Sequence, residues 1–436
     1  MAYTMDKLDA LRAEIDRIDA EMTRLFAQRM ATSAEIAAVK RENGLPVRDA
    51  KREAELIAQN QNRLADPKLR AYYGAFQERV MACSRAYQTE LLGQDPAALL
   101  SVRTAAGAYP IYLRRGALLD AGTLLDLNRR VFLLTDDGVP AEYSRSLASR
   151  CRQALCCTIP HGEASKSMTQ LQALLSQMLD AGLTREDCVL AVGGGVVGDL
   201  AGLAAALYMR GIDFYNVPTT LLAMVDSSVG GKTAVDLDGV KNAVGAFWPP
   251  RAVLIDPNVL NTLPQRQRSN GLAEAVKMAL TRDPVLFARF EDPNGYGAEE
   301  DLIAACLRIK ASVVEADERE AGLRRVLNFG HTLGHGIEAA ADGALLHGEC
   351  VALGMLPMCA PVLRERLTAV LKRLGLPAAL KPGTIDPERV LCAIVHDKKA
   401  QTDGEISIVR VSEPGQYRFC TADIDALRTA LYSLLA

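Results

Sequence analysis

An uninterrupted helical pattern near the start of the chain most restricts what it can fold into. Residues 5–42 contain neither proline nor glycine, and their apolar residues recur at helical steps. At about 1.5 Å per residue, one helix over this stretch would be on the order of 55 Å long. A domain of under about 100 residues cannot cover such a stripe by folding on itself, so the pattern predicts a partner chain. The stripe consists of Leu8, Leu11, Ile15, Ile18, Met22, Leu25, Met30 and Ile36.

Two further helices are expected before the pattern changes. Asn43, Gly44 and Pro46 end the first helix, a second is expected over about 49–63, and a third over about 66–92. Residues 93–96 then have the composition of a linker. We therefore expect an all-α domain over residues 1–93.

The remainder of the chain has the rhythm of a mainly parallel sheet, followed by helices. Short apolar runs at 131–135, 188–192, 214–217 and 252–255 alternate with helical stretches. Past about residue 265 helical patterns dominate, with one strand-like stretch at 406–411. This predicts an α/β domain over 98–264 and a mainly α-helical domain over 265–436.

Composition narrows the classes of partner. The net charge of −3 and pI of about 6.1 favour neither nucleic acid nor an anionic membrane. The longest strongly apolar stretch, 200–209, is about half the ~20 residues that span a bilayer, and residues 1–12 lack the apolar segment of a secretion signal. We therefore expect a cytoplasmic protein. Ten cysteines without a Cys-x-x-Cys pair predict neither a disulfide framework nor a thiolate zinc site.

A set of polar residues stands out on the predicted N-terminal helices. The set comprises Arg12, Arg29, Lys40, Asp49, Arg52, Glu53, Ser84 and Gln88. Taken singly, each is most simply a solvated charge, but their order and spacing resemble the all-helical bacterial chorismate mutases over residues 5–90. The resemblance implies a rearrangement of chorismate to prephenate, which needs cations and hydrogen-bond donors but no acid/base pair.

The resemblance also implies a role for each residue of this set. The three arginines would hold the substrate carboxylates, since a guanidinium binds a carboxylate in bidentate fashion. Lys40 and Gln88 would face the ether oxygen, Glu53 with the Asp49 backbone the hydroxyl, and Ser84 would line the pocket. Two chains intertwine in this family, so Arg12 would reach the partner's site. A sensor domain that binds chorismate or prephenate without turnover remains the alternative.

A glycine-rich segment follows one of the predicted strands. Gly193, Gly195 and Gly198 satisfy G-x-G-x-x-G, but we expect the segment after the second or third strand rather than the first, unlike the usual dinucleotide fingerprint. A helix that begins there would still seat a pyrophosphate. Residues 226–233 end like a phosphate-binding P-loop, but Asp226 replaces its first glycine, which argues against one.

The histidines indicate a metal site. The chain has five, and His331, His335 and His347 fall within 17 residues. Spacing alone favours His331 and His335 as the metal pair, because residues four apart share a helix face.

Seven segments stand out in the second part of the chain: 191–199, 208–211, 217–222, 271–277, 328–335, 346–349 and 397–399. Through these segments, the chain over about 100–436 resembles 3-dehydroquinate synthase. The resemblance implies a Rossmann-like NAD-binding domain followed by a helical metal- and substrate-binding domain. Instead of the pair His331 and His335, it implies that Glu274, His331 and His347 hold a catalytic Zn²⁺ (or Co²⁺), with an open coordination position for substrate.

The implied reaction converts 3-deoxy-arabino-heptulosonate 7-phosphate to 3-dehydroquinate and phosphate, with NAD recycled in place. The phosphate would be bound by Lys232, Asn242, Arg210, Asn328 and His335, and the carboxylate by Lys310, Arg324 and Lys398, the last close to even with Lys399. Asp226, Lys277 and Glu320 would surround the hydroxyls and the metal. NAD would contact Asp136, Glu163, Lys166, Gly195, Asp199, Thr219, Thr220 and Lys241, with Asn242 beside them. The motif at residues 136–138 departs from the family, which tends to have Asn where Gly138 stands.

Related sugar-phosphate cyclases that form deoxy-scyllo-inosose or epi-valiolone share the metal and NAD motifs. Lys310, Arg324 and Asn328 together suit a carboxylated substrate better than a neutral sugar, which favours dehydroquinate synthase. We expect small-molecule substrates, no nucleic-acid or membrane partner, and a homodimer formed through both parts of the chain.

Overall fold

The computed structural model describes residues 2–42, 47, 49–92, 95, 97–381, 383–398 and 405–435. The chain divides into two compact units, Met1–Ala98 and Leu99–Ala436. Each unit is described by itself. Among the helices of the described residues, none is both long and apolar enough to span a membrane.

The first unit is built from three helices and a short 3-10 turn. They are α1 (Ala2–Glu42), α2 (Ala50–Asn62), η1 (Pro67–Leu69) and α3 (Arg70–Leu91). Asp49 caps α2 by accepting a hydrogen bond from the Arg52 amide at 3.0 Å, and Asp66 caps η1 in the same way. The expected breaker at 43–46 lies outside the described residues.

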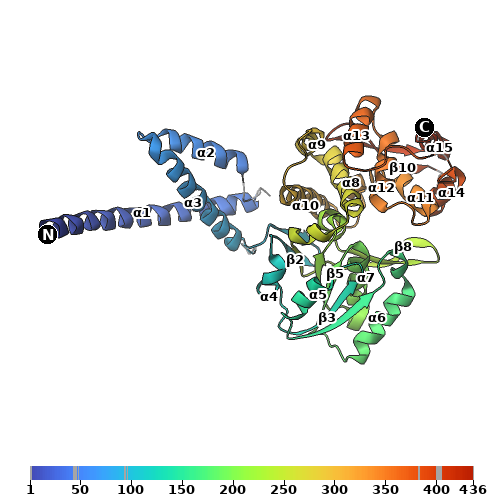
Figure 1. Ribbon diagram of the computed structural model, residues 1–436, viewed down its shortest axis with the longest axis horizontal. Coiled ribbons are helices and arrows are strands. Elements are labelled where there is room, and N and C mark those ends of the chain that lie inside the picture. Colours follow the sequence, from blue (N-terminus) through green and yellow to red (C-terminus); the bar gives the residue numbers. More distant parts are fainter. Residues whose placement is uncertain are drawn as a thin grey trace. The chain divides into compact units, whose positions relative to one another are not determined.

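Helix α1 is long and largely uncovered in a single chain. Its N-terminal half extends beyond α2 and α3 (Figure 1), and the apolar side chains of its predicted stripe stay in solvent except for Met30, which is half-buried. Leu11 and Ile15 are each 57% exposed and Leu25 is 49% exposed. The C-terminal part of α1 packs against α3, where Met81, Ser84 and Gln88 are buried.

The second unit contains a seven-stranded sheet in the order β1-β2-β9-β6-β5-β3-β4. All neighbouring strands run parallel except β1 and β2, which form an antiparallel hairpin. The strands are β1 (Leu100–Thr104), β2 (Gly107–Leu113), β3 (Arg130–Asp136), β4 (Gln153–Ile159), β5 (Cys188–Gly193), β6 (Asp213–Pro218) and β9 (Ala252–Ile255).

Both faces of the central strands are buried. Phe132 and Leu134 of β3 and Val189 of β5 face a core cluster that includes side chains of α6 (Met168–Asp180) and α7 (Gly195–Leu207). Leu133, which alternates with them and points to the other face, is also 0% exposed. Continuous apolar runs are typical of strands covered on both faces, which is why these strands could be predicted.

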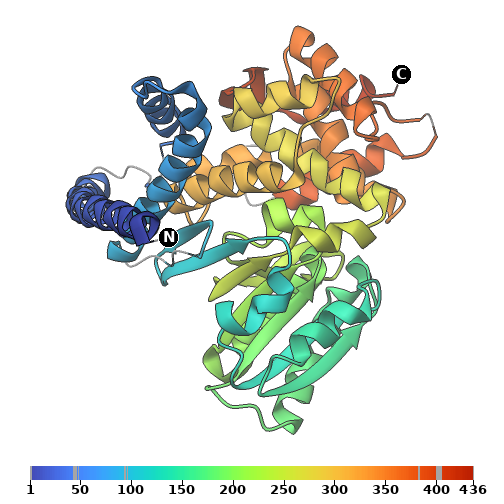
Figure 2. The ribbon, with the colours of Figure 1, turned by 60° about the vertical axis from the view of Figure 1, so that its left-hand side comes forward.

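Helices dominate the second half of this unit and gather on one side of the sheet (Figures 1 and 2). The helices of the unit not yet named are α4 (Ala121–Leu124), α5 (Ala141–Ala148), α8 (Gln265–Arg282), α9 (Pro284–Glu291), α10 (Glu299–Ala316), α11 (His331–Ala341), α12 (His347–Met355), α13 (Pro361–Arg373), α14 (Pro387–Lys398) and α15 (Ile424–Tyr432). Two antiparallel hairpins complete it: β7 (Lys232–Leu237) with β8 (Val240–Phe247), and β10 (Ile406–Glu413) with β11 (Gln416–Ala422). Short 3-10 or π turns are η2 (Ala117–Asp120), η3 (Glu163–Ser165), η4 (Tyr208–Arg210), η5 (Ala223–Ser227), η6 (Pro257–Thr262), η7 (Leu323–Asn328) and η8 (Leu356–Met358).

One expectation about strand order is wrong. The glycine-rich segment follows β5, the fifth strand of the chain, because β1, β2 and β4 were not recognised. Strand β4 is an edge strand with several exposed positions, and its apolar run at 154–157 consists of Ala, Leu and Cys, with no β-branched or aromatic residue typical of strands. By contrast, the argument against a P-loop agrees with the structure, since Lys232 begins a strand instead of a helix.

Candidate active sites

The glycine-rich turn lies at the carboxyl edge of the parallel sheet. Helix α7 begins at Gly195, directly after β5, and the neighbouring strands β3 and β6 end at Asp136 and Pro218. Thr219 and Thr220 follow β6 at once. Residues expected to contact NAD therefore collect where open α/β sheets bind their ligands.

Other residues of the expected cofactor set are joined by short polar contacts. The buried Lys166 ammonium lies 2.5 Å from Asp199 Oδ2 and donates to Asn242 Oδ1 at 2.5 Å. Burial lowers the pKa of Lys166, but the carboxylates of Asp199, Glu163 and Asp236 together outweigh it and the pKa is raised. Lys241, next to Asn242 on β8, lies 3.9 Å from Glu163 Oε1. The β7–β8 hairpin thus contributes to this group.

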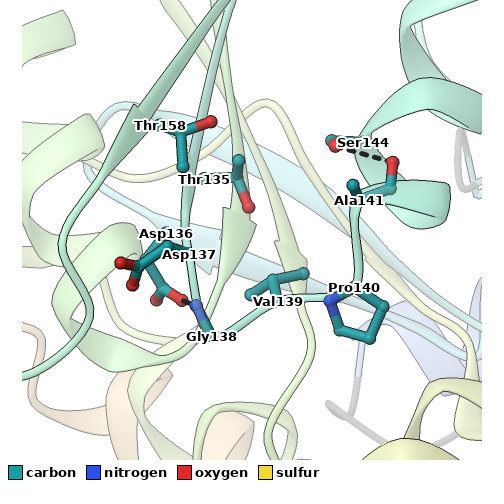
Figure 3. A pocket seen from close by; sticks show the side chains of 9 residues that line it. All are labelled: Thr135, Asp136, Asp137, Gly138, Val139, Pro140, Ala141, Ser144 and Thr158. Carbon is teal, nitrogen blue, oxygen red and sulfur yellow. Dashed lines mark hydrogen bonds between the residues drawn. The ribbon is translucent and has the colours of Figure 1, made fainter.

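A cavity of about 370 Å³ lies between the end of β3 and the start of α5 (Figure 3). Asp136 lies on its wall and its Oδ1 accepts a hydrogen bond from the Gly138 amide at 2.9 Å. Asp137 is instead paired with the His161 ring at 2.7 Å. The residues that line the cavity are Thr135, Asp136, Asp137, Gly138, Val139, Pro140, Ala141, Ser144 and Thr158. With Gly138 in place of the family's usual Asn, Asp136 keeps its place on the cavity wall.

Three side chains that could hold a metal converge from three helices. Glu274 lies within α8, while His331 and His347 are the first residues of α11 and α12. Their Nε2 atoms lie 3.5 and 3.4 Å from Glu274 Oε1, and the ligand atoms all lie within 4.8 Å of one another. Tetrahedral bonds of about 2.0–2.1 Å separate ligands by roughly 3.3 Å, so the spacing fits a common centre.

A glycine permits this approach of α11 and α12. A Cβ atom on Gly354 would lie 2.0 Å from the carbonyl oxygen of Gly330, which precedes α11. Any larger residue at Gly354 would force the two helices apart, and with them the imidazoles of His331 and His347.

The environment of Glu274 suits a cation. Its side chain is 1% exposed, and both of its oxygens are buried without a hydrogen-bond partner among the described residues. The Lys277 ammonium contacts Oε2 as an ion pair only. Burial raises the pKa of Glu274, but the charges of Lys277 and His331 outweigh it and hold the pKa well below its usual value. Because Lys277 already pairs with Oε2, Oε1 is the oxygen left for a metal ion, and it is also the one nearest the two imidazoles. A buried carboxylate oxygen without a partner is costly unless a cation binds it.

The remaining ring nitrogens of the two histidines have partners. Nδ1 of His331 lies 3.1 Å from the Phe329 carbonyl, and Nδ1 of His347 lies 3.1 Å from Glu338 Oε2. Such contacts leave Nε2 available for a metal. Burial lowers the pKa of His347, but the nearby carboxylates of Glu274 and Glu338 outweigh it and raise the pKa to about 10.

Glu338 was missed in the sequence, although it lies seven residues after His331, two turns along the same helix. A second group able to hold a metal overlaps the first: His335, Glu338 and His347. The rings of His331 and His335 lie 5.1 Å apart, so the i,i+4 pair is close in space. However, in the group that contains the buried carboxylate of Glu274, the two histidines are His331 and His347, not His331 and His335.

Residues expected to bind substrate form a second layer of charge pairs. Lys310 contacts Asp226, and Lys232 contacts Glu320. Asn328 donates to Glu320 Oε1 at 2.5 Å. Burial raises the pKa of Asp226, but the positive charges of Lys310 and Lys277 outweigh it and lower the pKa. One carboxylate thus interacts with two ammonium groups.

Arg324 is buried and held by backbone carbonyls. Its guanidinium donates to Glu318 O at 2.5 Å and to Gly230 O at 3.3 Å. Gly230 has φ +107°, and a Cβ there would lie 2.4 Å from Arg324 Nη2, so glycine is required for this approach.

Arg210 is not brought to this group within one chain. It lies between the end of α7 and the start of β6, at the amino edge of the sheet, whereas Gly195 and Thr219 lie at the carboxyl edge. Its side chain is exposed. Lys398 ends α14, and Lys399 lies outside the described residues, so the choice between them stays a prediction.

In the first unit, part of the expected pocket is formed between α1 and α3. Arg29 donates to Ser84 Oγ, which lies 3.1 Å from Ser33 Oγ. Gln88 is 6% exposed, and its Oε1 is buried without a hydrogen-bond partner among the described residues. Lys40 donates to the Val47 carbonyl at 2.5 Å. The buried side-chain amide of Gln88 therefore keeps unused hydrogen-bonding capacity.

Other members of this set lie apart or have unexpected partners. Glu53 of α2 pairs with Arg85 of α3 at 2.7 Å, and Arg85 was not among the expected residues. Arg52 is exposed. Arg12 pairs with Asp9, is 65% exposed, and precedes Arg29 by 17 residues, or about 25 Å along α1.

Comparison with known proteins follows the same division of the chain. Residues 156–270 match the family model of the 3-dehydroquinate synthase N-terminal domain, and residues 271–400 match that of its C-terminal domain. The 3-dehydroquinate synthase of Symbiobacterium thermophilum is 44% identical over 353 residues, which are 75% of this chain and 98% of that protein. That of Lactiplantibacillus plantarum is 41% identical over 357 residues, 77% and 99% of the two chains.

The chain belongs to the 3-dehydroquinate synthase family. It also carries a chorismate mutase type II domain, matched over residues 11–89, so the expected fusion of the two domains is confirmed. We refer to residues 1–98 as the mutase unit and to residues 99–436 as the synthase unit. The pairing of these domains associates the chain with the shikimate pathway.

Solved structures confirm the fold class of the synthase unit. A 2-deoxy-scyllo-inosose synthase complexed with carbaglucose-6-phosphate, NAD⁺ and Co²⁺ has a TM-score of 0.70 at 25% identity, covering 77% of this chain and all of that one. A 2-epi-5-epi-valiolone synthase from Streptomyces hygroscopicus, with NAD⁺ and Zn²⁺ bound, has a TM-score of 0.68 at 28% identity, covering 75% and 96%.

Proposed function

We propose that the synthase unit converts 3-deoxy-arabino-heptulosonate 7-phosphate to 3-dehydroquinate and phosphate, and that the mutase unit converts chorismate to prephenate. One observation supports the first activity: Glu274, His331 and His347 come together in the same unit as the carboxyl edge of the sheet, where the residues expected to contact NAD lie. We place the domains at 1–93, 98–264 and 265–436.

In this proposal the chain binds NAD⁺ and one divalent ion, Zn²⁺ or Co²⁺, held by Glu274, His331 and His347. When bound, the nicotinamide would supply reversible hydride transfer and the ion would polarise the substrate oxygens. Lys232, Asn242, Asn328 and His335 would bind the phosphate. Lys310, Arg324 and Lys398 would bind the carboxylate. In the absence of substrate, the contact with Asp226 holds the buried ammonium of Lys310 in position, and a substrate anion would take the place of Asp226 as its partner.

The curated relatives support the carboxylated substrate. The 3-dehydroquinate synthases described above share 41–44% of their residues with this chain, whereas the two sugar-phosphate cyclases share 25–28%. The retained Lys310, Arg324 and Asn328 agree with this choice.

The decisive experiment measures phosphate release from the heptulosonate phosphate by the full chain, with and without EDTA and added NAD⁺. We expect activity to require both the metal and NAD⁺. Activity that survives complete metal removal would contradict the proposed site.

For the mutase unit we propose catalysis in a homodimer. The uncovered stripe of α1 and the distance of Arg12 from Arg29 support a second copy that supplies Arg12. Likewise, a role for Arg210 in phosphate binding requires a second copy in the synthase unit. Prephenate formation by the full chain, compared with a Lys40→Ala variant, separates turnover from sensing: a sensor would bind prephenate but form none.

A further inference from the structure

One carboxylate in the synthase unit makes contacts on two sides. Glu338 of α11 accepts from His347 through Oε2, at 3.1 Å, and contacts the Lys241 ammonium through Oε1, at 2.8 Å. Its side chain is 13% exposed. Both oxygens are thus engaged, one with an expected metal ligand and the other with an expected cofactor residue.

The second side continues into the cofactor group. Lys241 lies on β8 beside Asn242, whose side chain accepts from Lys166. Lys166 in turn contacts Asp199 on α7, the helix that starts at the glycine-rich turn. Polar contacts, joined by the peptide link between Lys241 and Asn242, therefore connect His347 with the residues expected around NAD.

We propose that Glu338 is a positioning residue that couples the metal site to the NAD site. This inference rests on the proposed function, since it presumes that both ligands bind. A carboxylate on the outer nitrogen of a histidine ligand fixes the tautomer and the orientation of the ring. If the same carboxylate also holds Lys241 and its hairpin, the ligand that orders one side reduces the ordering cost for the other.

Such coupling is reciprocal and measurable. NAD⁺ should bind the metal-loaded protein more tightly than the metal-free protein, within the usual range of about 5–150-fold. Glu338→Gln keeps the size of the side chain but removes its charge. We expect this variant to lose about 10–100-fold in metal affinity, and its NAD⁺ affinity to become independent of the metal.

The readouts do not depend on turnover. Metal affinity is measured by graded chelator dialysis of the full chain, and ligand geometry by the visible spectrum of the Co²⁺-loaded protein. NAD⁺ affinity, with and without metal, is measured by equilibrium dialysis. A general loss of structure would lower NAD⁺ affinity but would not selectively remove its dependence on the metal.

Two matched variants separate the two contacts of Glu338. Lys241→Met breaks only the cofactor side, so metal affinity should stay near wild type while the coupling is lost. Glu291→Gln removes a carboxylate that pairs with Arg366 at 2.7 Å on the surface of α9, and should behave as wild type in both measurements.

The outcomes are distinct. Wild-type coupling in Glu338→Gln or in Lys241→Met would overturn the inference and leave the proposed function intact. A wild-type protein that binds no divalent ion, or binds it unchanged after Glu274→Gln, would overturn the proposed function itself.

Discussion

The two units differ in how far their charged and apolar side chains are buried. In the synthase unit, Glu274, Lys277 and Lys310 are buried in contact with opposite charges, and the central strands are covered on both faces. In the mutase unit, Ile15 and its neighbours on α1 stand in solvent and Arg12 lies far from Arg29. The residues of the candidate metal site therefore meet within one chain, whereas we expect the mutase pocket to need a second chain to be complete.

The largest test of this contrast is Glu274→Gln. Loss of the metal should reduce phosphate release by about 10³-fold or more, since metal catalysis supplies several kcal/mol. Prephenate formation by the same preparation should be unchanged, because that reaction needs cations and donors only. Bound metal is measured alongside both activities, and a parallel loss of the two would refute the independence of the units.

The next largest expected effect is the loss of prephenate formation when an arginine of the mutase unit is replaced. Arg12→Ala and Arg52→Ala should each lose about 10²–10³-fold in prephenate formation, the usual cost of removing one such donor. When the two variants are co-expressed, a twofold-symmetric dimer restores one intact site in each mixed pair, or roughly a quarter of wild-type activity. No restoration would mean that Arg12 serves its own chain.

A smaller effect is expected from the stripe itself. Ile15→Asp replaces a side chain whose burial between chains contributes about 1.5–3 kcal/mol. The variant should show prephenate formation that falls on dilution, with normal phosphate release. Val362→Asp is the matched control, because Val362 is 68% exposed on α13, which lies outside the mutase unit. Identical dilution curves for both variants would argue against a dimer through α1.

The contrast also explains what the sequence could and could not predict. Helix α1 and strands β3, β5, β6 and β9 were predicted, since their patterns are long or continuously apolar. Strands β1, β2, β4, β7, β8 and β11 were not predicted. Glycine, proline or polar residues interrupt the patterns of most of them, and the apolar run of β4 has no β-branched or aromatic residue.

The site residues follow a similar rule. Spacing pointed to His331 and His335, which share one helix, and only the family resemblance supplied Glu274 and His347 from other helices. Their meeting depends on tertiary packing such as that at Gly354, which no local pattern encodes. Glu338 and Arg85 were missed for the same reason: their partners lie on other helices or strands.

The smallest expected effect compares one ion pair from each unit by pH. Asp187 in the synthase unit is 4% exposed and accepts from Arg130 at 2.7 Å and from the Thr184 amide at 2.6 Å. Burial raises the pKa of Asp187, but these hydrogen bonds outweigh it and lower the pKa. Its stabilising effect is therefore complete above the unfolded pKa of about 3.9 and is lost as pH falls through the lower folded value.

Asp187→Asn should accordingly cost about 1–3 kcal/mol of unfolding free energy at pH 7, with a difference from wild type that shrinks below about pH 4. Urea unfolding followed by the fluorescence of Trp248, the one tryptophan of the chain, measures it in the synthase unit. In the mutase unit, the hydrogen bond from Arg17 lowers the pKa of Glu14, but the side chains are 71% and 54% exposed. Glu14→Gln should therefore leave helix unfolding, measured by circular dichroism, unchanged, because solvent screens such pairs. Equal losses in the two variants would show that burial does not separate the units as described.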